Sequence, residues 1–245
     1  MFPIRDHNPS GRTPLVTYAL LMVNIGVFLA YWLTMRGEDQ IGQFFYDWGL
    51  VPDRLIVGYS PATVVTHMFL HGGWLHLAGN MLFLWIFGDN LEDQLGHLGF
   101  ALFYLTCGLA AAALQVAADV TSGVPMIGAS GAIAGVLGGY LVLFPRSRVD
   151  VLFIFVIFFR IFAIPAWVVL GVWFGIQVFQ GLNSPSDGVA YLAHVGGFVG
   201  GAVLILPAWM RRGGFAFWAR TAGHPAHPAA EYKLSKSGIP RVGRR

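Results

Sequence analysis

Four polar residues stand in otherwise apolar stretches of this sequence, and their types suit acyl-transfer chemistry: His76, Asn80, Ser130 and His194. Polar and ionisable side chains are costly inside a membrane-spanning segment, so each of them favours a functional role. A serine hydroxyl becomes a nucleophile when a neutral imidazole accepts its proton. The pattern therefore predicts Ser130 as a nucleophile and His194 as its general base.

Three hydrogen-bond donors could surround the oxyanion that forms when a serine attacks a peptide carbonyl. His76 and Asn80 are four residues apart, so on a helix they share one face. Ser130 lies between Gly128 and Gly131, which permit a tight turn and leave the hydroxyl unobstructed. Its N–H is then near a helix N-terminus, which favours negative charge. We expect the two side chains and this N–H to stabilise the oxyanion.

The composition requires lipid as the solvent for most of the chain. The 245 residues are 56% hydrophobic and 11% charged, whereas soluble domains carry about 25% charged residues. Six apolar stretches have the character of membrane-crossing helices. They cover about residues 15–33, 74–87, 100–118, 130–144, 165–180 and 189–209. We therefore expect an all-α membrane protein built as a six-helix bundle.

The segments outside these helices complete the predicted organisation. We expect residues 1–13 to be a cytoplasmic N-terminal segment, residues 14–210 the membrane domain, and residues 211–245 a basic, disordered cytoplasmic tail. Residues 36–63 are predicted to form a long loop with short interfacial helices. Residues 149–164 are predicted to form a membrane-associated loop before the fifth helix.

The distribution of Lys and Arg predicts the orientation of the bundle. Six crossings would put thirteen of the fifteen basic residues on the side of the two termini, and only Arg36 and Arg54 on the other. Cytoplasmic loops carry an excess of basic residues, so both termini should be cytoplasmic. We interpret the basic pI of about 9.2 as this orientation signal and expect no nucleic-acid partner.

The predicted depths of the four polar residues agree with one another. With Phe144 near the cytoplasmic face, a helix from Ser130 would place that serine about 8 Å below the outer surface of a hydrocarbon core about 30 Å thick. His194, near the start of the sixth helix, would lie about 7–8 Å down. His76 and Asn80 fall in the first two turns of the second helix, which also starts outside.

Small residues could bring the fourth and sixth helices together. Glycines recur every four residues on both, and such stripes let helix backbones approach closely in lipid. They are Gly131, Gly135 and Gly139 on the fourth helix and Gly197 and Gly201 on the sixth. If the stripes face each other, His194 can reach Ser130. No Asp or Glu is present at this depth, so we predict a catalytic dyad.

Four blocks of sequence, in this order, are similar to those of bacterial rhomboid proteases, and the resemblance covers about residues 14–210. The blocks are His71-Gly72-Gly73-Trp74-Leu75-His76-Leu77-Ala78-Gly79-Asn80, Gly88 to Gly96 around Glu92, Gly128-Ala129-Ser130-Gly131, and Ala193-His194-Val195-Gly196-Gly197 with Gly201. The resemblance implies that Ser130 is the nucleophile, His194 the base, and His76 and Asn80 oxyanion-stabilising side chains.

The resemblance also implies supporting residues and a substrate class. His71 matches a supporting histidine near the cavity, and Glu92 a structural residue near the cytoplasmic end of the second helix. Family members cleave single-pass membrane proteins in or near the span. The resemblance places such a protein in the bacterial inner membrane, with its active site open to the outer side. We expect no cofactor or metal, and the oligomeric state is open.

Each of these residues also has a purely structural interpretation. Ser130 could only cap a helix, His194 could be a satisfied buried histidine, and Asn80 could join helices. A metal site at His67, His71 and His76 lacks acidic partners and an HExxH pattern.

Two other functions compete with proteolysis. A catalytically silent relative could bind membrane clients, although such relatives usually lack the serine or the histidine. A transporter or channel would show inverted repeats or mid-span charges, and the sequence has neither.

Overall fold

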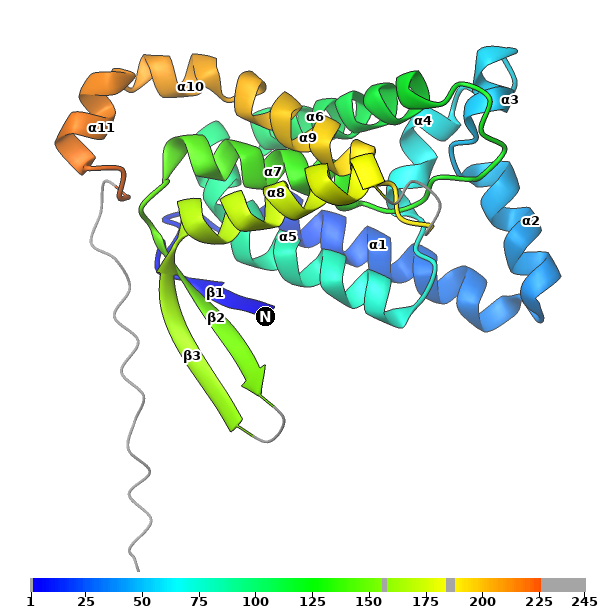
Figure 1. Ribbon diagram of the computed structural model, residues 1–245, viewed down its shortest axis with the longest axis horizontal. Coiled ribbons are helices and arrows are strands. Elements are labelled where there is room, and N and C mark those ends of the chain that lie inside the picture. The colour runs from blue at the N-terminus through cyan, green and yellow to red at the C-terminus, as the bar shows by residue number, and fades with distance from the viewer. Residues whose placement is uncertain (1, 156–157, 184–187, 226–245) are drawn as a thin grey trace, which may run out of the picture.

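The computed structural model describes residues 2–155, 158–183 and 188–225, and it is mainly helical (Figure 1). The long helices are α1 (Leu15–Thr34), α5 (Trp74–Leu95), α6 (His97–Ala118), α7 (Ser130–Leu143), α8 (Ala166–Asn183) and α9 (Tyr191–Leu204). The short ones are α2 (Glu38–Trp48), α3 (Pro52–Ile56), α4 (Thr63–Thr66), the 3-10 helix η1 (His67–Phe69), α10 (Leu206–Arg211) and α11 (Phe215–Thr221). Three strands complete the chain: β1 (Phe2–Asp6), β2 (Arg148–Phe155) and β3 (Phe158–Pro165).

Long apolar helices dominate the described part of the chain. Four segments are long and apolar enough to cross a membrane: α1, α6, α8 and Tyr191–Arg211, which joins α9 to α10. Helix α7 is apolar but shorter, and α5 extends for 22 residues with a polar C-terminal end. The predicted predominance of apolar, membrane-length helices is therefore confirmed, whereas the strands β1, β2 and β3 contradict the all-α prediction.

Helix α7 forms the centre of the bundle. Every residue from Gly131 to Tyr140 is buried, and α7 packs against α5, α6 and α9. The outer helix α1 instead buries a single stripe, spaced three or four residues apart, as expected for one helical face. That stripe consists of Thr17, Leu21, Asn24, Phe28 and Tyr31.

Glycine sets the distance between α7 and α9. A Cβ at Gly197 would collide with the carbonyl of Gly131, and one at Gly201 would collide with the backbone of Gly135. Gly197 and Gly201 therefore lie directly on the backbone of α7, so the expected close approach of the two helices is present. The predicted α7 stripe faces α6 and not α9, because a Cβ at Gly131, Gly135 or Gly139 would strike Ala111, Cys107 or Phe103 of α6. Gly138 is the α7 glycine that points at α9, where its Cβ would collide with the carbonyl of Phe198. The small residues of α7 thus bring α6 close as well.

The segment predicted as a membrane-associated loop at 149–164 is a β-hairpin. Strands β2 and β3 pair antiparallel along their whole length, and their β-branched and aromatic residues favour an extended backbone. The polar N-terminal segment supplies β1, which pairs with β2 to give the order β1-β2-β3. Asp150 of β2 anchors that strand through Arg5 (2.5 Å) and His7 (2.9 Å).

Two further predictions differ from the structure. The second helix continues past residue 87 to Leu95, so Glu92 is helical. Part of the segment predicted to be disordered forms α11, because Phe217 is buried and Trp218 donates to the carbonyl of Val142 at 3.0 Å. Residues 226–245 lie outside the described residues, so disorder there stays a prediction. Residues 36–63 contain α2 and α3, in line with the expected short helices.

Candidate active site

Ser130 is the first residue of α7, at the end of the bundle where α5 and α9 also begin. The turn before it depends on Gly128, whose φ of +126° favours glycine. A Cβ there would lie 2.8 Å from Nε2 of His76 and 3.4 Å from Oγ of Ser130. The Gly128 N–H donates to the carbonyl of His67 at 2.9 Å, which fixes the turn. A side chain at position 128 would therefore crowd both His76 and the serine hydroxyl.

His194 meets Ser130 from the first turn of α9. Its Nε2 lies 2.8 Å from the Oγ of Ser130, within hydrogen-bond distance. The contact of Gly197 with Gly131 holds the two helices at the separation that this bond requires. Trp173 flanks the imidazole, with ring centroids 5.9 Å apart. The geometry is that of a hydroxyl with a base positioned to accept its proton.

The other nitrogen of His194 has a partner that the sequence reasoning missed. Gln177 of α8 places its Oε1 2.7 Å from Nδ1 of His194, and its side chain is buried. The sequence leads us to expect only an acidic residue as an orienting partner, and an uncharged amide occupies that position instead. A signal was available, since Gln177 is a polar residue inside the apolar run of α8 and such residues favour a role.

His76 and Asn80 lie in the first two turns of α5, and His76 lies beside the turn that precedes Ser130. The N–H of Gly72 donates to Nδ1 of His76 at 3.2 Å, so the ring proton of neutral His76 is on Nε2. That nitrogen faces Gly128 beside the Ser130 hydroxyl. Asn80 donates one amide hydrogen to the carbonyl of His76 at 2.8 Å and keeps a second available. Nε2–H of His76 can therefore donate towards the space next to Ser130. Asn80 lies one turn further along α5, and its oxyanion role stays a prediction.

A family model for the rhomboid domain matches residues 59–211, which is more than half of the chain. This chain belongs to the rhomboid family. Family membership and the long apolar helices together indicate that this rhomboid is an integral membrane protein.

Three curated relatives illustrate the range of the similarity. Rhomboid protease GluP of Bacillus subtilis is 30% identical over 185 residues, which cover 76% of this chain and 33% of GluP. Rhomboid protein 1, mitochondrial, of Saccharomyces cerevisiae is 31% identical over 144 residues, or 57% of this chain and 39% of that protein. RHOMBOID-like protein 5 of Arabidopsis thaliana is 32% identical over 93 residues, or 38% and 30%. The rhomboid thus spans well under half the length of these relatives.

His71 supports the site from behind His76. It is fully buried, and the two imidazole rings meet edge to face with centroids 5.1 Å apart. The Tyr31 hydroxyl accepts from the His71 N–H at 3.0 Å and donates to its carbonyl. In this rhomboid, His71 packs against His76 and does not contact Ser130 directly.

Glu92 lies at the other end of α5, away from Ser130. Its carboxylate accepts from the N–H groups of Val16 and Thr17 at 2.8 Å each, and from the Thr17 hydroxyl at 2.7 Å. A carboxylate at a helix N-terminus accepts hydrogen bonds from the free N–H groups there, and its negative charge interacts favourably with the positive end of the helix dipole. His97 contacts the same carboxylate at 2.5 Å. Glu92 therefore fastens α1 to α5.

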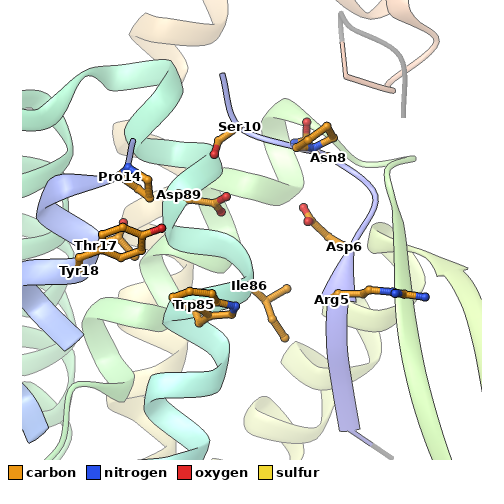
Figure 2. Close-up of a pocket in the computed structure, with 11 residues that line it drawn as sticks. Arg5, Asp6, Asn8, Ser10, Pro14, Thr17, Tyr18, Trp85, Ile86 and Asp89 are labelled. Atoms are coloured by element: carbon orange, nitrogen blue, oxygen red, sulfur yellow. The ribbon is translucent and has the colours of Figure 1, made fainter. Parts of the chain in front are cut away.

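A cavity of about 190 Å³ lies at that same end, between β1 and helices α1 and α5. Figure 2 shows the Asp6 and Asp89 side chains pointing into it from opposite sides. Asp6 accepts from the Tyr140 hydroxyl at 2.7 Å and from Asn90 at 3.1 Å. Burial raises the pKa of Asp6 to about 7. The cavity is separate from the serine site, which lies at the opposite ends of α5 and α7.

No group of three or more His, Cys, Asp or Glu side chains is arranged to hold a metal ion in the part of the chain that the structure describes.

Proposed function

We propose that this rhomboid is an intramembrane serine endopeptidase, which hydrolyses peptide bonds in or near the transmembrane segments of single-pass membrane proteins. The observation that carries the proposal is the 2.8 Å contact between Nε2 of His194 and Oγ of Ser130. Membership of the rhomboid family and similarity to a protein named as a protease support it.

The acylation step follows from the positions of these groups. His194 accepts the hydroxyl proton through Nε2 while Oγ of Ser130 forms a bond to the scissile carbonyl carbon. The carbonyl oxygen becomes an oxyanion, for which Nε2–H of His76, the Asn80 amide and the Ser130 N–H are the available donors. The protonated His194 then gives its proton to the leaving amine, and the peptide C–N bond breaks.

Deacylation returns the enzyme to its starting state. A water molecule gives a proton to His194 and attacks the acyl-enzyme carbonyl carbon. The second tetrahedral intermediate collapses as His194 returns the proton to Oγ of Ser130, and a carboxylic acid product leaves. This sequence needs water beside Ser130, which suits a serine at the outermost residue of α7. It needs no cofactor.

We propose a topology of six crossings by α1, α5, α6, α7, α8 and α9, with both termini cytoplasmic. Contacts at the end of the bundle far from Ser130 support this topology, because they join both terminal segments to the C-terminal end of α5. Arg12 lies 3.9 Å from Asp93, and Arg212 donates to the carbonyl of Gln94 at 3.1 Å. The excess of Lys and Arg on this side marks it as cytoplasmic.

This orientation opens the serine site to the outer side of the membrane. For a bacterial chain, the membrane would be the inner one. The substrates would then present their cleavage sites near the outer surface, at the depth of the first turns of α5 and α9.

The alternative function is a silent relative that binds membrane clients without cutting them. Loss of the serine or histidine would be expected in such a protein, whereas here the two side chains are retained at bonding distance. That contact favours proteolysis.

Cleavage of a tagged single-span protein by the purified rhomboid in liposomes tests the proposal. We expect product from the wild type and from Ser122→Ala, a control that removes a partly exposed loop hydroxyl, which accepts from the Val124 N–H. Neither Ser130→Ala nor His194→Ala should yield product. Cleavage by Ser130→Ala at the wild-type rate would overturn the proposal, and intact binding without cleavage by the wild type would favour the silent alternative. Activity should also fall on acidification, since protonated His194 cannot accept the Ser130 proton.

A further inference from the structure

We propose that Gln177 is a positioning residue that holds His194 in the tautomer and orientation needed to accept the Ser130 proton. The inference rests on the proposed protease function and adds a third, uncharged member to the expected dyad. It also places that member on α8, a helix that carries none of the predicted catalytic residues.

The contacts of Gln177 fix which end of its amide faces the imidazole. Its Oε1 lies 2.7 Å from Nδ1 of His194. Its amide nitrogen donates to the carbonyl of Trp173, one turn earlier on α8, at 3.4 Å. If the amide were rotated by half a turn, its oxygen would face the Trp173 carbonyl oxygen, and two acceptors would repel. The backbone of α8 therefore favours an acceptor towards His194.

An acceptor at Nδ1 determines the tautomer of the histidine. The amide oxygen can only accept, so neutral His194 must carry its ring proton on Nδ1. Nε2 then has a lone pair directed at Oγ of Ser130, 2.8 Å away. Without that acceptor, the tautomer with a proton on Nε2 becomes accessible and cannot serve as the base. Gln177 thus selects the reactive form.

The surroundings keep this contact in place. Gln177 is only 8% exposed, which limits competition from water for Nδ1. Helix α8 is held against α9 by Phe174, whose ring stacks on Phe198 with centroids 4.5 Å apart. Trp173 packs near the imidazole from the same helix. The position of His194 is therefore defined by α8 as well as by α9.

Kinetics in liposomes with the same single-span substrate test this role. Gln177→Leu removes the acceptor at similar size, and we expect kcat to fall about 10- to 100-fold with KM within about twofold. Gln180→Leu, three residues along α8, removes an amide without touching His194 and should behave as wild type. Thermal unfolding should be alike for both variants.

Gln177→Glu supplies a readout that a merely structural role would not move. It keeps an acceptor at Nδ1, so it should retain more activity than Gln177→Leu. Its carboxylate favours protonated imidazole, so the acidic limb of the pH–rate profile should move to higher pH. Wild-type kinetics in Gln177→Leu, or an unmoved profile in Gln177→Glu, would overturn the positioning role. Ser130→Ala in the same series separates this failure from failure of the protease proposal, because it must stay inactive if that proposal holds.

A separate observation concerns the β2–β3 hairpin, and we infer that it rests in the headgroup region of the bilayer leaflet at the α8 N-terminus. Four large apolar side chains on it are exposed by 46–65%: Ile154, Phe159, Ile161 and Phe162. In Figure 1 the hairpin extends away from the helices at the end where α7 finishes and α8 begins. β3 ends at Pro165, and the apolar helix α8 starts at the next residue.

The edge position of β3 decides how deep the hairpin can lie. In the order β1-β2-β3 one side of β3 has no partner strand among the described residues. Unpaired backbone groups cannot be satisfied in the hydrocarbon core, but water and headgroups satisfy them at the interface. In water alone, an apolar edge strand would favour aggregation. Exposed Arg160, amid these apolar residues, suits lipid phosphates.

Site-specific fluorescence in phosphatidylcholine–phosphatidylglycerol vesicles tests the location. We would attach an environment-sensitive NBD label at Phe159→Cys and at Glu38→Cys, an exposed position on α2. The wild type sets the labelling background, because Cys107 is buried. We expect blue-shifted emission at 159, quenched more by lipids with a shallow doxyl group than a deep one. Emission at 159 like that at 38 would overturn the inference. A blue shift that is not quenched by either lipid and is lost on dilution would also overturn it, because it would indicate contact with a second copy of the chain.

Discussion

Gly197→Ala should separate the serine from its base while changing no catalytic group. The added Cβ would collide with the carbonyl oxygen of Gly131, which follows Ser130 directly. Ordinary contacts to a Cβ begin at 3.4 Å, and this one would lie more than about 1 Å inside that limit. Because both neighbours are backbone, α9 must move away from α7 as a unit. His194 is on the moving helix, so its 2.8 Å contact with Ser130 would lengthen beyond hydrogen-bond distance.

The expected loss of activity is about 100-fold, since a displacement of about 1 Å at reacting groups has an effect of that order. Overpacking should also lower the free energy of unfolding by about 1–3 kcal/mol. Gly175→Ala is the matched control, because it makes the same change on the neighbouring spanning helix where a Cβ meets nothing within 4 Å. Cleavage rates in liposomes and thermal unfolding would be measured for both. Wild-type activity in a folded Gly197→Ala protein would refute the claim that this approach sets the distance between Ser130 and His194.

Three further predictions concern other parts of the molecule. Gly128→Ala should reduce kcat at least about 10-fold, because φ at this residue is +126° and the added Cβ would lie 2.8 Å from Nε2 of His76. Gly79→Ala is the control, since a Cβ there meets nothing within 4 Å. Equal cleavage rates for the two variants would contradict the account. Glu92→Ala should lower the free energy of unfolding, measured by denaturation, by about 2–3 kcal/mol, because the N–H groups of Val16 and Thr17 lose their acceptor. Asp93→Ala should have a small effect in the same assay. Asp6 has a pKa raised by burial from 3.8 to about 7, so the folded protein holds a proton that the unfolded chain releases. The contribution of Asp6 to stability should be complete below about pH 4 and be lost as the pH rises through about 7. Asp6→Asn should flatten the plot of unfolding free energy against pH over this range. An unchanged slope would argue against a protonated Asp6.

The positions of the long helices and the common depth of the site residues were predictable, because each is encoded within a single segment of sequence. The apolar runs predict the long helices, and the Gly-xxx-Gly spacing on α9 predicts its approach to α7. Ser130, His76 and His194 each stand near the start of a helix, so their common depth follows from helix rise alone. These are properties of single segments that packing in lipid preserves.

The features that the sequence did not predict depend on contacts between segments. The hairpin at 149–164 forms because β1, distant in sequence, pairs with β2 and anchors Asp150. Helix α11 forms because Trp218 reaches the end of α7. Gln177 acquires its role only from the position of His194, 17 residues later on another helix. Hydropathy reports how apolar a segment is, and it carries no information on such pairings.

Covalent capture of the nucleophile tests the central claim most directly. An alkyl fluorophosphonate reacts with a serine hydroxyl only when a base accepts its proton, forming a stable O–P bond with loss of fluoride. Peptide mass spectrometry of the treated rhomboid in liposomes should find the adduct on Ser130, and His194→Ala should lower its rate of formation to background. Labelling of a different serine, or of Ser130 at the same rate without His194, would contradict the account.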